Sequence, residues 1–236
     1  MIRIGVTGTD TGVGKTLVTA ALAAALTRRG FRVAAVKPIE TGCEFDDPNR
    51  DGARLARAAN ETRGLAVVAP LTFQEPVAPM LAAELAARPI DLDALDRAVE
   101  KAAEDCDVLL LEGAGGLFVP ITAAVSYAEL FARWSLDVVI VAVNRLGAIN
   151  HVRLTIAAAR AAGLTVRAVV LNQIGGDGSD RSVGDNARLI ALLEHVPIVQ
   201  LPRAPTVDDL AVAANLVERS GLVDLIAAPA AVPPSV

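Results

Sequence analysis

A glycine-rich loop lies between a short apolar run and an Ala-rich segment near the start of the chain. The apolar run is Ile2–Thr7, and the loop that follows reads GTDTGVGKT from Gly8 to Thr16. A strand, a loop of this kind and a helix in succession form a phosphate-binding P-loop, in which backbone N–H groups and the helix N-terminus face an anion. This order of elements favours an α/β fold.

The loop departs in one place from the consensus P-loop. The consensus has a glycine five positions before its final glycine, whereas this chain has Thr9 there and Gly8 one residue earlier. The alternative is a glycine-rich turn that binds no ligand, but the Gly-Lys-Thr ending and the flanking strand and helix favour phosphate binding. Lys15 is expected to reach the β- and γ-phosphates of ATP, and the Thr16 hydroxyl to ligate Mg²⁺. The loop residues expected to bind ATP are Gly12, Val13, Gly14, Lys15 and Thr16.

Short apolar runs alternate with helical patterns along the chain. The predicted strands are Ile2–Thr7, Arg32–Lys37, Asp107–Leu111, Asp137–Val143, Thr165–Leu171 and Pro197–Leu201. The predicted helices are Thr16–Arg29, Asp51–Asn60, Asp91–Glu104, Ala148–Ala162, Asn186–Glu194 and Val207–Ser220. This alternation predicts a single α/β domain of the P-loop NTPase type over residues 1–226, with a mostly parallel sheet covered by helices on both faces. Residues 227–236 lack periodicity and are expected to form a disordered tail.

Composition argues against several kinds of partner. Aromatic residues make up 3% of the chain and the net charge is −5, so neither stacking platforms nor a basic surface for nucleic acid or an anionic membrane is expected. The longest apolar runs, Leu17–Leu26 and Val138–Val143, are far shorter than the roughly 20 residues of a spanning helix. The first residues do not resemble a signal peptide, and Cys43 and Cys106 have no metal-like spacing. We expect a soluble cytoplasmic protein.

Two further strands are expected to deliver charged side chains to the P-loop. Glu112 follows an apolar strand and precedes Gly113–Gly116, which suits a carboxylate on the Mg²⁺ side of a nucleotide. Lys37 ends another strand, where its ammonium could hold an anionic substrate or neutralise a transferring phosphoryl group. The alternative for both is a solvated side chain at a strand end. Asp51 opens a helical pattern, so capping that helix and ligating Mg²⁺ compete for its carboxylate.

Taken together, these motifs resemble those of the dethiobiotin synthetase family over residues 2–220. The segments that carry the resemblance are Gly8–Thr16, Lys37-Pro38, Thr41-Gly42, Pro70–Phe73, Glu75-Pro76, Pro79, Glu112–Gly116, Gly147–His151 and Leu171-Asn172. The resemblance implies an ATP- and Mg²⁺-dependent cyclo-ligase of biotin biosynthesis. Such an enzyme carboxylates 7,8-diaminononanoate with CO2 and closes the ring to dethiobiotin through a carbamic-phosphoric mixed anhydride.

The resemblance also implies a role for particular residues. Lys15 and Lys37 would be catalytic, and Thr16, Asp51 and Glu112 would hold Mg²⁺. ATP would contact Gly12, Val13, Gly14, Lys15, Thr16, Asp51, Glu112, Asn172, Pro202 and Arg203. The diamine would contact Thr11, Lys37, Thr41, Gly115, Gly147, Ala148, Ile149 and Asn150. The last four form a helix start contributed by the partner subunit, which implies a homodimer with its substrate site at the interface. His151 is expected to be a packing or helix-terminal residue.

Three other functions fit parts of this pattern. A P-loop ATPase switch of the partitioning type often carries an extra lysine early in the loop, where this chain has Thr9, Asp10 and Thr11. An ATP-dependent corrinoid amide synthase usually brings a glutamine-hydrolysing domain, for which the chain has no room. A non-catalytic nucleotide-binding module leaves Lys37 and Glu112 without a role.

Overall fold

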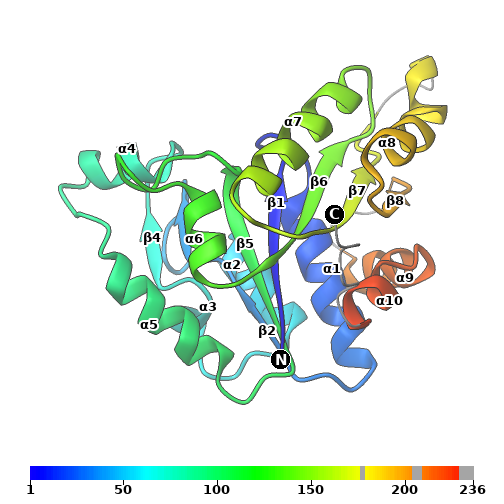
Figure 1. The fold of residues 1–236 in the computed structure, drawn as a ribbon. Helices are drawn as coiled ribbons and strands as arrows, with labels where there is room; N and C mark the ends of the chain where they lie inside the picture. Colours follow the sequence, from blue (N-terminus) through cyan, green and yellow to red (C-terminus); the bar gives the residue numbers. More distant parts are fainter. Residues whose placement is uncertain (176–178, 204–208, 229–236) are drawn as a thin grey trace.

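The core of the computed structural model is a six-stranded parallel sheet (Figure 1). The structure describes residues 1–175, 179–203 and 209–228. The strands are β1 (Ile2–Gly8), β2 (Val33–Val36), β5 (Val108–Gly116), β6 (Asp137–Val143), β7 (Val166–Asn172) and β8 (Ile198–Leu201). Their order is β2-β5-β1-β6-β7-β8, and every neighbouring pair is parallel. The predicted α/β fold with a mostly parallel sheet is confirmed.

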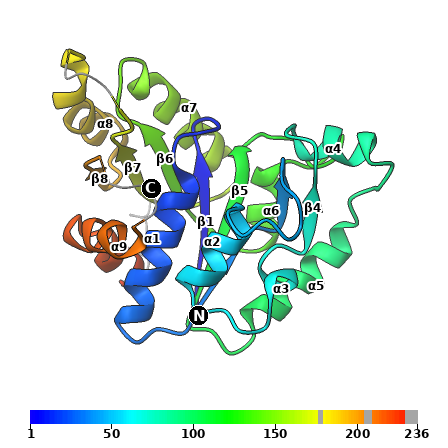
Figure 2. The ribbon, with the colours of Figure 1, turned by 180° about the vertical axis from the view of Figure 1, so that it is seen from behind.

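Helices cover both faces of this sheet, as predicted (Figure 2). One face is covered by α1 (Lys15–Arg28), α2 (Asp51–Ala58), α9 (Leu210–Arg219) and α10 (Leu222–Ala227). The other carries α4 (Pro79–Leu85), α5 (Leu92–Ala103), α6 (Tyr127–Arg133), α7 (Ala148–Ala161) and α8 (Asn186–Glu194). Two short elements, α3 (Leu65–Val68) and the 3₁₀ helix η1 (Arg181–Gly184), complete the described helices. Among these residues, no helix is both long and apolar enough to cross a membrane.

The central strands are apolar on both faces because each face contacts a layer of helices. Along β5, Val108 and Leu110 belong to the core under α1, whereas Leu109 and Leu111 belong to the core under α5 and α6. All four side chains are fully buried. Alternate residues of a strand point to opposite faces, so a strand covered twice shows a continuous apolar run. The hydrophobic runs in the sequence reflect this double burial.

A second, two-stranded parallel sheet was not predicted. It consists of β3 (Ile39–Thr41) and β4 (Leu71–Phe73). Pro38 separates β3 from β2 in the sequence, and proline lacks the N–H that a strand interior requires. Three-residue strands give no readable periodicity, which is why sequence analysis missed this sheet.

Several predicted boundaries are wrong. β5 does not end at Leu111 but continues to Gly116, so Glu112 lies within the strand. A register irregularity between Val6 and Gly8 of β1 lets the pairing of the two strands extend to Gly116. The last long helix, predicted as 207–220, is α9. It begins at Leu210, where the Asp209 side chain accepts a hydrogen bond from the N–H of Val212. Residues 207 and 208 of the predicted helix lie outside the described residues. Residue 227 of the predicted tail is the last of α10, and residues 229–236 are not described.

Candidate active site

The P-loop connects β1 to α1 and is shaped by two glycines with positive φ. Gly12 has φ 74° and Gly14 has φ 92°, a left-handed conformation that residues with a Cβ adopt at a cost. Gly14 has no side chain to cap α1, so the first N–H groups of the helix have no side-chain acceptor at that position. This is the arrangement in which a helix N-terminus binds a phosphate.

Asn172, the last residue of β7, contacts the P-loop. Its Nδ2 donates a 3.1 Å hydrogen bond to the carbonyl of Val13, and the residue is buried. A Cβ on Gly14 would lie 2.2 Å from this same Nδ2. The tight contact requires glycine at position 14 and couples the loop to β7, which is two strands away from β1 in the sheet.

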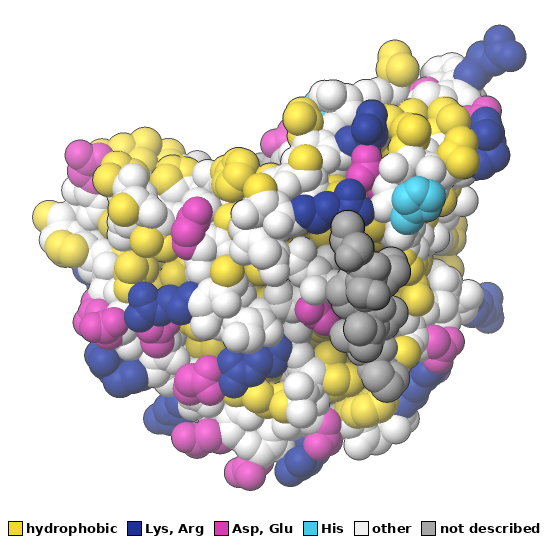
Figure 3. Space-filling model, viewed as in Figure 1, with side chains coloured by type: hydrophobic (Ala, Val, Ile, Leu, Met, Phe, Trp, Pro, Cys, Tyr) yellow, Lys and Arg dark blue, Asp and Glu magenta, His cyan; other side chains and the backbone are white. Residues whose placement is uncertain are grey.

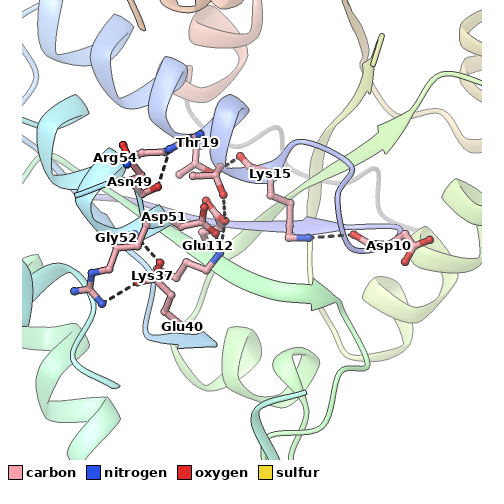
Figure 4. A network of polar contacts seen from close by, with 12 residues as sticks. Asp10, Lys15, Thr19, Lys37, Glu40, Asn49, Asp51, Gly52, Arg54 and Glu112 are labelled. Atoms are coloured by element: carbon pink, nitrogen blue, oxygen red, sulfur yellow. Dashed lines mark hydrogen bonds and ion pairs between the residues drawn. The ribbon is translucent and has the colours of Figure 1, made fainter. Parts of the chain in front are cut away.

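Three charged side chains meet beside the first turn of α1 (Figure 4). Lys37, which follows β2, donates a 2.8 Å hydrogen bond to Oε1 of Glu112 and also bonds the Asp51 carboxylate. The same Oε1 of Glu112 accepts a 2.7 Å hydrogen bond from the Thr16 hydroxyl. Lys15 lies close by and donates to the carbonyl of Asp10 over 3.1 Å. The structure therefore brings together both predicted catalytic lysines and all three predicted Mg²⁺ ligands.

Asp51 does not cap α2. The residue before the helix is Arg50, whose extended conformation places it at the N-cap, and Asp51 is the first helical residue. No side chain caps this helix; the Asp51 carboxylate instead faces Lys37. The capping interpretation of Asp51 is wrong because its carboxylate contacts the lysine rather than its own helix.

Burial and charge act in opposite directions on the lysines. Burial disfavours the charged form of Lys37, but the carboxylates of Glu112 and Asp51 outweigh this effect and raise the pKa of Lys37 above its ordinary value. Desolvation opposes ionisation of Asp51 too, yet the ammonium of Lys37 lowers the pKa of Asp51. Lys15 lacks so close a carboxylate, so burial lowers its pKa despite Glu112. A bound phosphate would supply a close negative charge for the Lys15 ammonium.

A cavity of about 540 Å³ opens over this cluster. Its walls include the predicted ATP residues Gly12, Gly14, Lys15, Thr16, Asp51 and Glu112, and the predicted substrate residues Thr11, Lys37, Thr41 and Gly115. Pocket sizes of a few hundred to a thousand Å³ are typical of small-molecule sites. One cavity thus joins the residues expected to bind the phosphates with four of those expected to bind the diamine.

Other predicted ATP residues lie outside this cavity. Val13 is buried, and Asn172 and Pro202 instead border a small apolar recess beside Leu17 and Leu216. Arg203 is exposed next to Pro202. Since Leu17 also borders the main cavity, the recess adjoins the phosphate region across one side chain.

The helix start at Gly147–Asn150 is likewise separate from the cavity. Gly147 precedes α7 with φ 91° and gives no side-chain cap, and Leu146 beside it is 79% exposed. His151 is exposed in the first turn of α7, so of the two expected roles, packing and helix-terminal, its position in one chain corresponds to the helix-terminal one. Within one chain, the predicted carboxylate-binding residues do not join the rest of the site.

The donor set fits a magnesium ion. Mg²⁺ usually binds one or two carboxylates together with phosphate oxygens and water, and Asp51, Glu112 and Thr16 offer that set. Oε2 of Glu112 is buried without any hydrogen-bond partner, a costly state for a carboxylate oxygen unless it acts as a ligand. No group of three His, Cys, Asp or Glu side chains able to hold a metal occurs among the described residues. The site therefore suits an ion that depends on the nucleotide for its remaining ligands.

Sequence reasoning missed part of the cavity wall. Arg54 lines it one helical turn after Asp51, and its charge contributes to the low pKa of that aspartate. The spacing i, i+3 places both side chains on one face of α2, which was a usable signal. Pro76–Pro79 and Val119 form an apolar part of the wall. Pro76 and Pro79 belong to segments that carry the family resemblance, but no role was predicted for them, and Val77, Ala78 and Val119 carry no pattern that distinguishes a cavity wall from a loop.

Comparisons with known proteins identify the family of the chain. A family model described as an AAA domain matches residues 3–211. The ATP-dependent dethiobiotin synthetase BioD of Anaeromyxobacter dehalogenans is 40% identical over 203 residues, which cover 86% of this chain and 90% of that protein. The chain belongs to the dethiobiotin synthetase family. The BioD protein of Aquifex aeolicus is 36% identical over 95% of this chain and 97% of its own length.

Membership in this family confirms the resemblance seen in the sequence and the prediction of an ATP-dependent ligase. Among solved structures, the MinC:MinD cell division protein complex of Aquifex aeolicus gives a TM-score of 0.55 at 18% identity, with 96% of this chain and 94% of that chain covered. This likeness shows the shared fold alone. It lends no weight to the ATPase-switch alternative.

Proposed function

We propose that this chain converts 7,8-diaminononanoate, CO2 and ATP into dethiobiotin, ADP and phosphate. The observation that carries the proposal is the position of Lys37, held between Asp51 and Glu112 in the same cavity that exposes P-loop residues. Thr11, Thr41 and Gly115 line the cavity beside it and supply polar groups for the diamine. A nucleotide-binding module without chemistry gives no reason to bury a lysine among carboxylates.

The reaction proceeds in three steps that require no protein nucleophile. One amine of the substrate adds to CO2 and loses a proton to form a carbamate. A carbamate oxygen then attacks the γ-phosphorus of ATP, which releases ADP and leaves a carbamic-phosphoric mixed anhydride. The second amine attacks the carbonyl carbon, the ureido ring closes and phosphate departs with loss of a proton. Catalysis of this kind depends on positioning and on neutralising charge.

The residues of the cavity divide this task. Lys15 contacts the β- and γ-phosphates from the P-loop. Lys37 faces the carbamate oxygen that attacks the γ-phosphorus and the phosphate oxygens next to it. Mg²⁺, held by Thr16, Asp51 and Glu112, neutralises phosphate charge when it is bound. Asn172 and the Pro202–Arg203 segment bind the adenine side, which the apolar recess next to Leu17 supports.

The site also calls for a second subunit. A substrate carboxylate needs an anion site, and the uncapped start of α7 at Gly147–Asn150 offers one that the chain's own cavity does not reach. Hydrophobic side chains gather over the α7 and α8 end of the molecule (Figure 3), where Leu146, Leu154 and Leu192 are each more than 60% exposed. A homodimer buries these leucines and brings one subunit's α7 to the other's cavity.

Product analysis tests the reaction directly. Purified protein is incubated with ATP, Mg²⁺ and bicarbonate, with and without the diamine, and phosphate release is measured alongside product mass. Phosphate release that depends on the diamine, with dethiobiotin as product, supports the proposal. Phosphate release indifferent to the diamine and without this product refutes it and favours the ATPase switch.

Subunit complementation tests the shared site. Lys37→Ala removes the cavity lysine, and Asn150→Glu places a negative charge at the start of α7. Each variant alone is expected to lose most of its activity as a homodimer. Mixed dimers contain one site in which both original residues are present, so mixing should restore part of the activity. Failure to restore any activity in proven mixed dimers, or full activity in a monomer by sedimentation, contradicts the shared site.

A further inference from the structure

A buried ion pair lies directly behind the Asp51 carboxylate and has no role in the reaction described above. Glu40 on β3 is 2% exposed and Arg50, before α2, is 4% exposed. Nη1 of Arg50 lies 3.1 Å from Oε2 of Glu40 and donates a 2.8 Å hydrogen bond to the Thr72 hydroxyl on β4. The small β3–β4 sheet is therefore tied to the residue at the start of α2.

Glu40 holds the same turn from a second direction. Its Oε1 accepts a 3.2 Å hydrogen bond from the backbone N–H of Gly52 (Figure 4). A Cβ on Gly52 would lie 2.9 Å from Oε2 of Glu40, so the carboxylate approaches this closely because residue 52 is glycine. Glu40 thus contacts the residues on both sides of Asp51.

These contacts determine where Asp51 points. Arg50 and Gly52 are held by Glu40, while the Asp51 carboxylate between them bonds Lys37. Two buried charges are expensive to maintain, and replacing such pairs with apolar residues is often neutral or stabilising. A contribution to stability therefore does not by itself explain why this ion pair is buried here. Holding the Asp51 carboxylate in one geometry does explain it.

We propose that Glu40 is a positioning residue, which acts with Arg50 to fix the first turn of α2 and so hold the Asp51 carboxylate in place for Mg²⁺ and Lys37. This inference rests on the proposed function in assigning Asp51 to the metal. Partners that orient a metal ligand typically affect metal affinity or activity by about 10-fold to 100-fold when they are lost. Glu40 is expected to act at this level.

The principal test is Glu40→Gln, which keeps the shape of the side chain and removes its charge. Its matched control is Glu61→Gln, because Glu61 follows the other end of α2 and its buried carboxylate pairs with Arg63. We expect the Mg²⁺ concentration that half-activates diamine-dependent turnover to rise by about 10-fold to 100-fold in Glu40→Gln. Nucleotide affinity in EDTA should stay unchanged, as should both quantities in Glu61→Gln. An unchanged Mg²⁺ requirement in Glu40→Gln overturns the proposal.

A double variant separates positioning from general weakening of the fold. Once Asp51→Asn has removed the carboxylate, adding Glu40→Gln should not raise the Mg²⁺ requirement further, because nothing remains to be positioned. Effects that multiply in the double variant overturn the proposal. Hydrogen exchange of the Gly52 amide gives a direct readout: protection should fall in Glu40→Gln, because a neutral amide oxygen is a weaker acceptor than a carboxylate, and stay unchanged in Asp51→Asn and Glu61→Gln.

Another double variant covers the case in which Glu40→Gln does not fold. The pair Glu40→Leu with Arg50→Met removes both buried charges and is expected to fold, since apolar replacement of an ion pair is tolerated. It should show the same raised Mg²⁺ requirement, and a normal requirement refutes the proposal. If no diamine-dependent turnover exists at all, the proposed function fails. The role of Glu40 is then still tested by how much Mg²⁺ tightens ATP binding and by hydrogen exchange of the Gly52 amide.

Discussion

The ammonium of Lys37 donates a 2.8 Å hydrogen bond to Oε1 of Glu112, although 75 residues separate the two in the chain. Both side chains are almost fully buried, and Asp51 supplies a second carboxylate to the same ammonium. The parallel pairing of β2 with β5 places Lys37 and Glu112 side by side, because each comes directly after a paired residue, Val36 and Leu111. The site therefore depends on sheet register as much as on residue identity.

Replacing Lys37 with alanine is expected to lower kcat by about 10²-fold to 10³-fold, the usual effect of losing one charge-stabilising group. ATP affinity should be largely kept, because Lys15 and the loop backbone remain. The variant also leaves Glu112 buried with one charge partner fewer, so its unfolding free energy should fall by about 3–5 kcal/mol. Steady-state kinetics, nucleotide calorimetry and denaturant unfolding measure the three effects. Lys101→Ala, on the exposed surface of α5, is the control. Wild-type turnover in Lys37→Ala refutes the catalytic role of Lys37.

Glu112→Gln should raise the Mg²⁺ requirement by at least about tenfold, because an amide is a poorer ligand for Mg²⁺ than a carboxylate. The amide also offers Lys37 no charge, which leaves Asp51 as its remaining charged partner in the cluster. Titration of turnover against Mg²⁺ at saturating ATP measures the change. Glu100→Gln serves as control, since this exposed glutamate pairs with Arg3 far from the cavity. An unchanged Mg²⁺ curve in Glu112→Gln removes Glu112 from the metal site.

Two glycines of the P-loop should respond differently to alanine. Both have positive φ, so each substitution costs about 1–2 kcal/mol of backbone strain. A Cβ at Gly12 has open space, whereas one at Gly14 would meet Nδ2 of Asn172 at 2.2 Å. Gly14→Ala should therefore be the more destabilising in denaturant unfolding without nucleotide.

The double variant Gly14→Ala with Asn172→Ala checks the origin of this difference. Removing the Asn172 amide should recover part of the stability lost in Gly14→Ala, since the clash disappears. The same Asn172→Ala change should give no recovery in Gly12→Ala. Equal costs for the two single substitutions contradict the close contact between Gly14 and Asn172.

The pH dependence of turnover should contain no ionisation of Lys37 in the neutral and mildly alkaline range. The pKa of Lys37 is raised above its ordinary 10.5, so its protonated state and the stability that depends on it persist below that value and are lost only above it. The pKa of Asp51 lies below its ordinary 3.8, so the contribution of its charged form is present above that value and is lost on acidification. Lysine-selective NMR titration should find no Lys37 transition below about pH 10. A transition near neutrality contradicts the paired arrangement.

The local parts of the site were readable from the sequence because each depends on neighbouring residues. The strand–loop–helix order around Lys15 predicts the P-loop, and the continuous apolar run before Glu112 predicts a doubly covered strand. The boundary of that strand was wrong, since its extension to Gly116 depends on pairing with β1. The Asp51 prediction was ambiguous for a related reason: a helix start shows that a carboxylate is present without showing what it faces.

The sequence by itself determined the fold class, the family and the residue types of the phosphate site, because periodicity and short motifs are local properties of the chain. The tertiary structure alone decided that Lys37 pairs with Asp51 and Glu112, that Glu40 and Arg50 are buried behind Asp51, and that the start of α7 lies apart from the cavity. These contacts join residues from separate elements. Their geometry follows from strand order, register and the packing of α2 on the sheet, which no local pattern encodes.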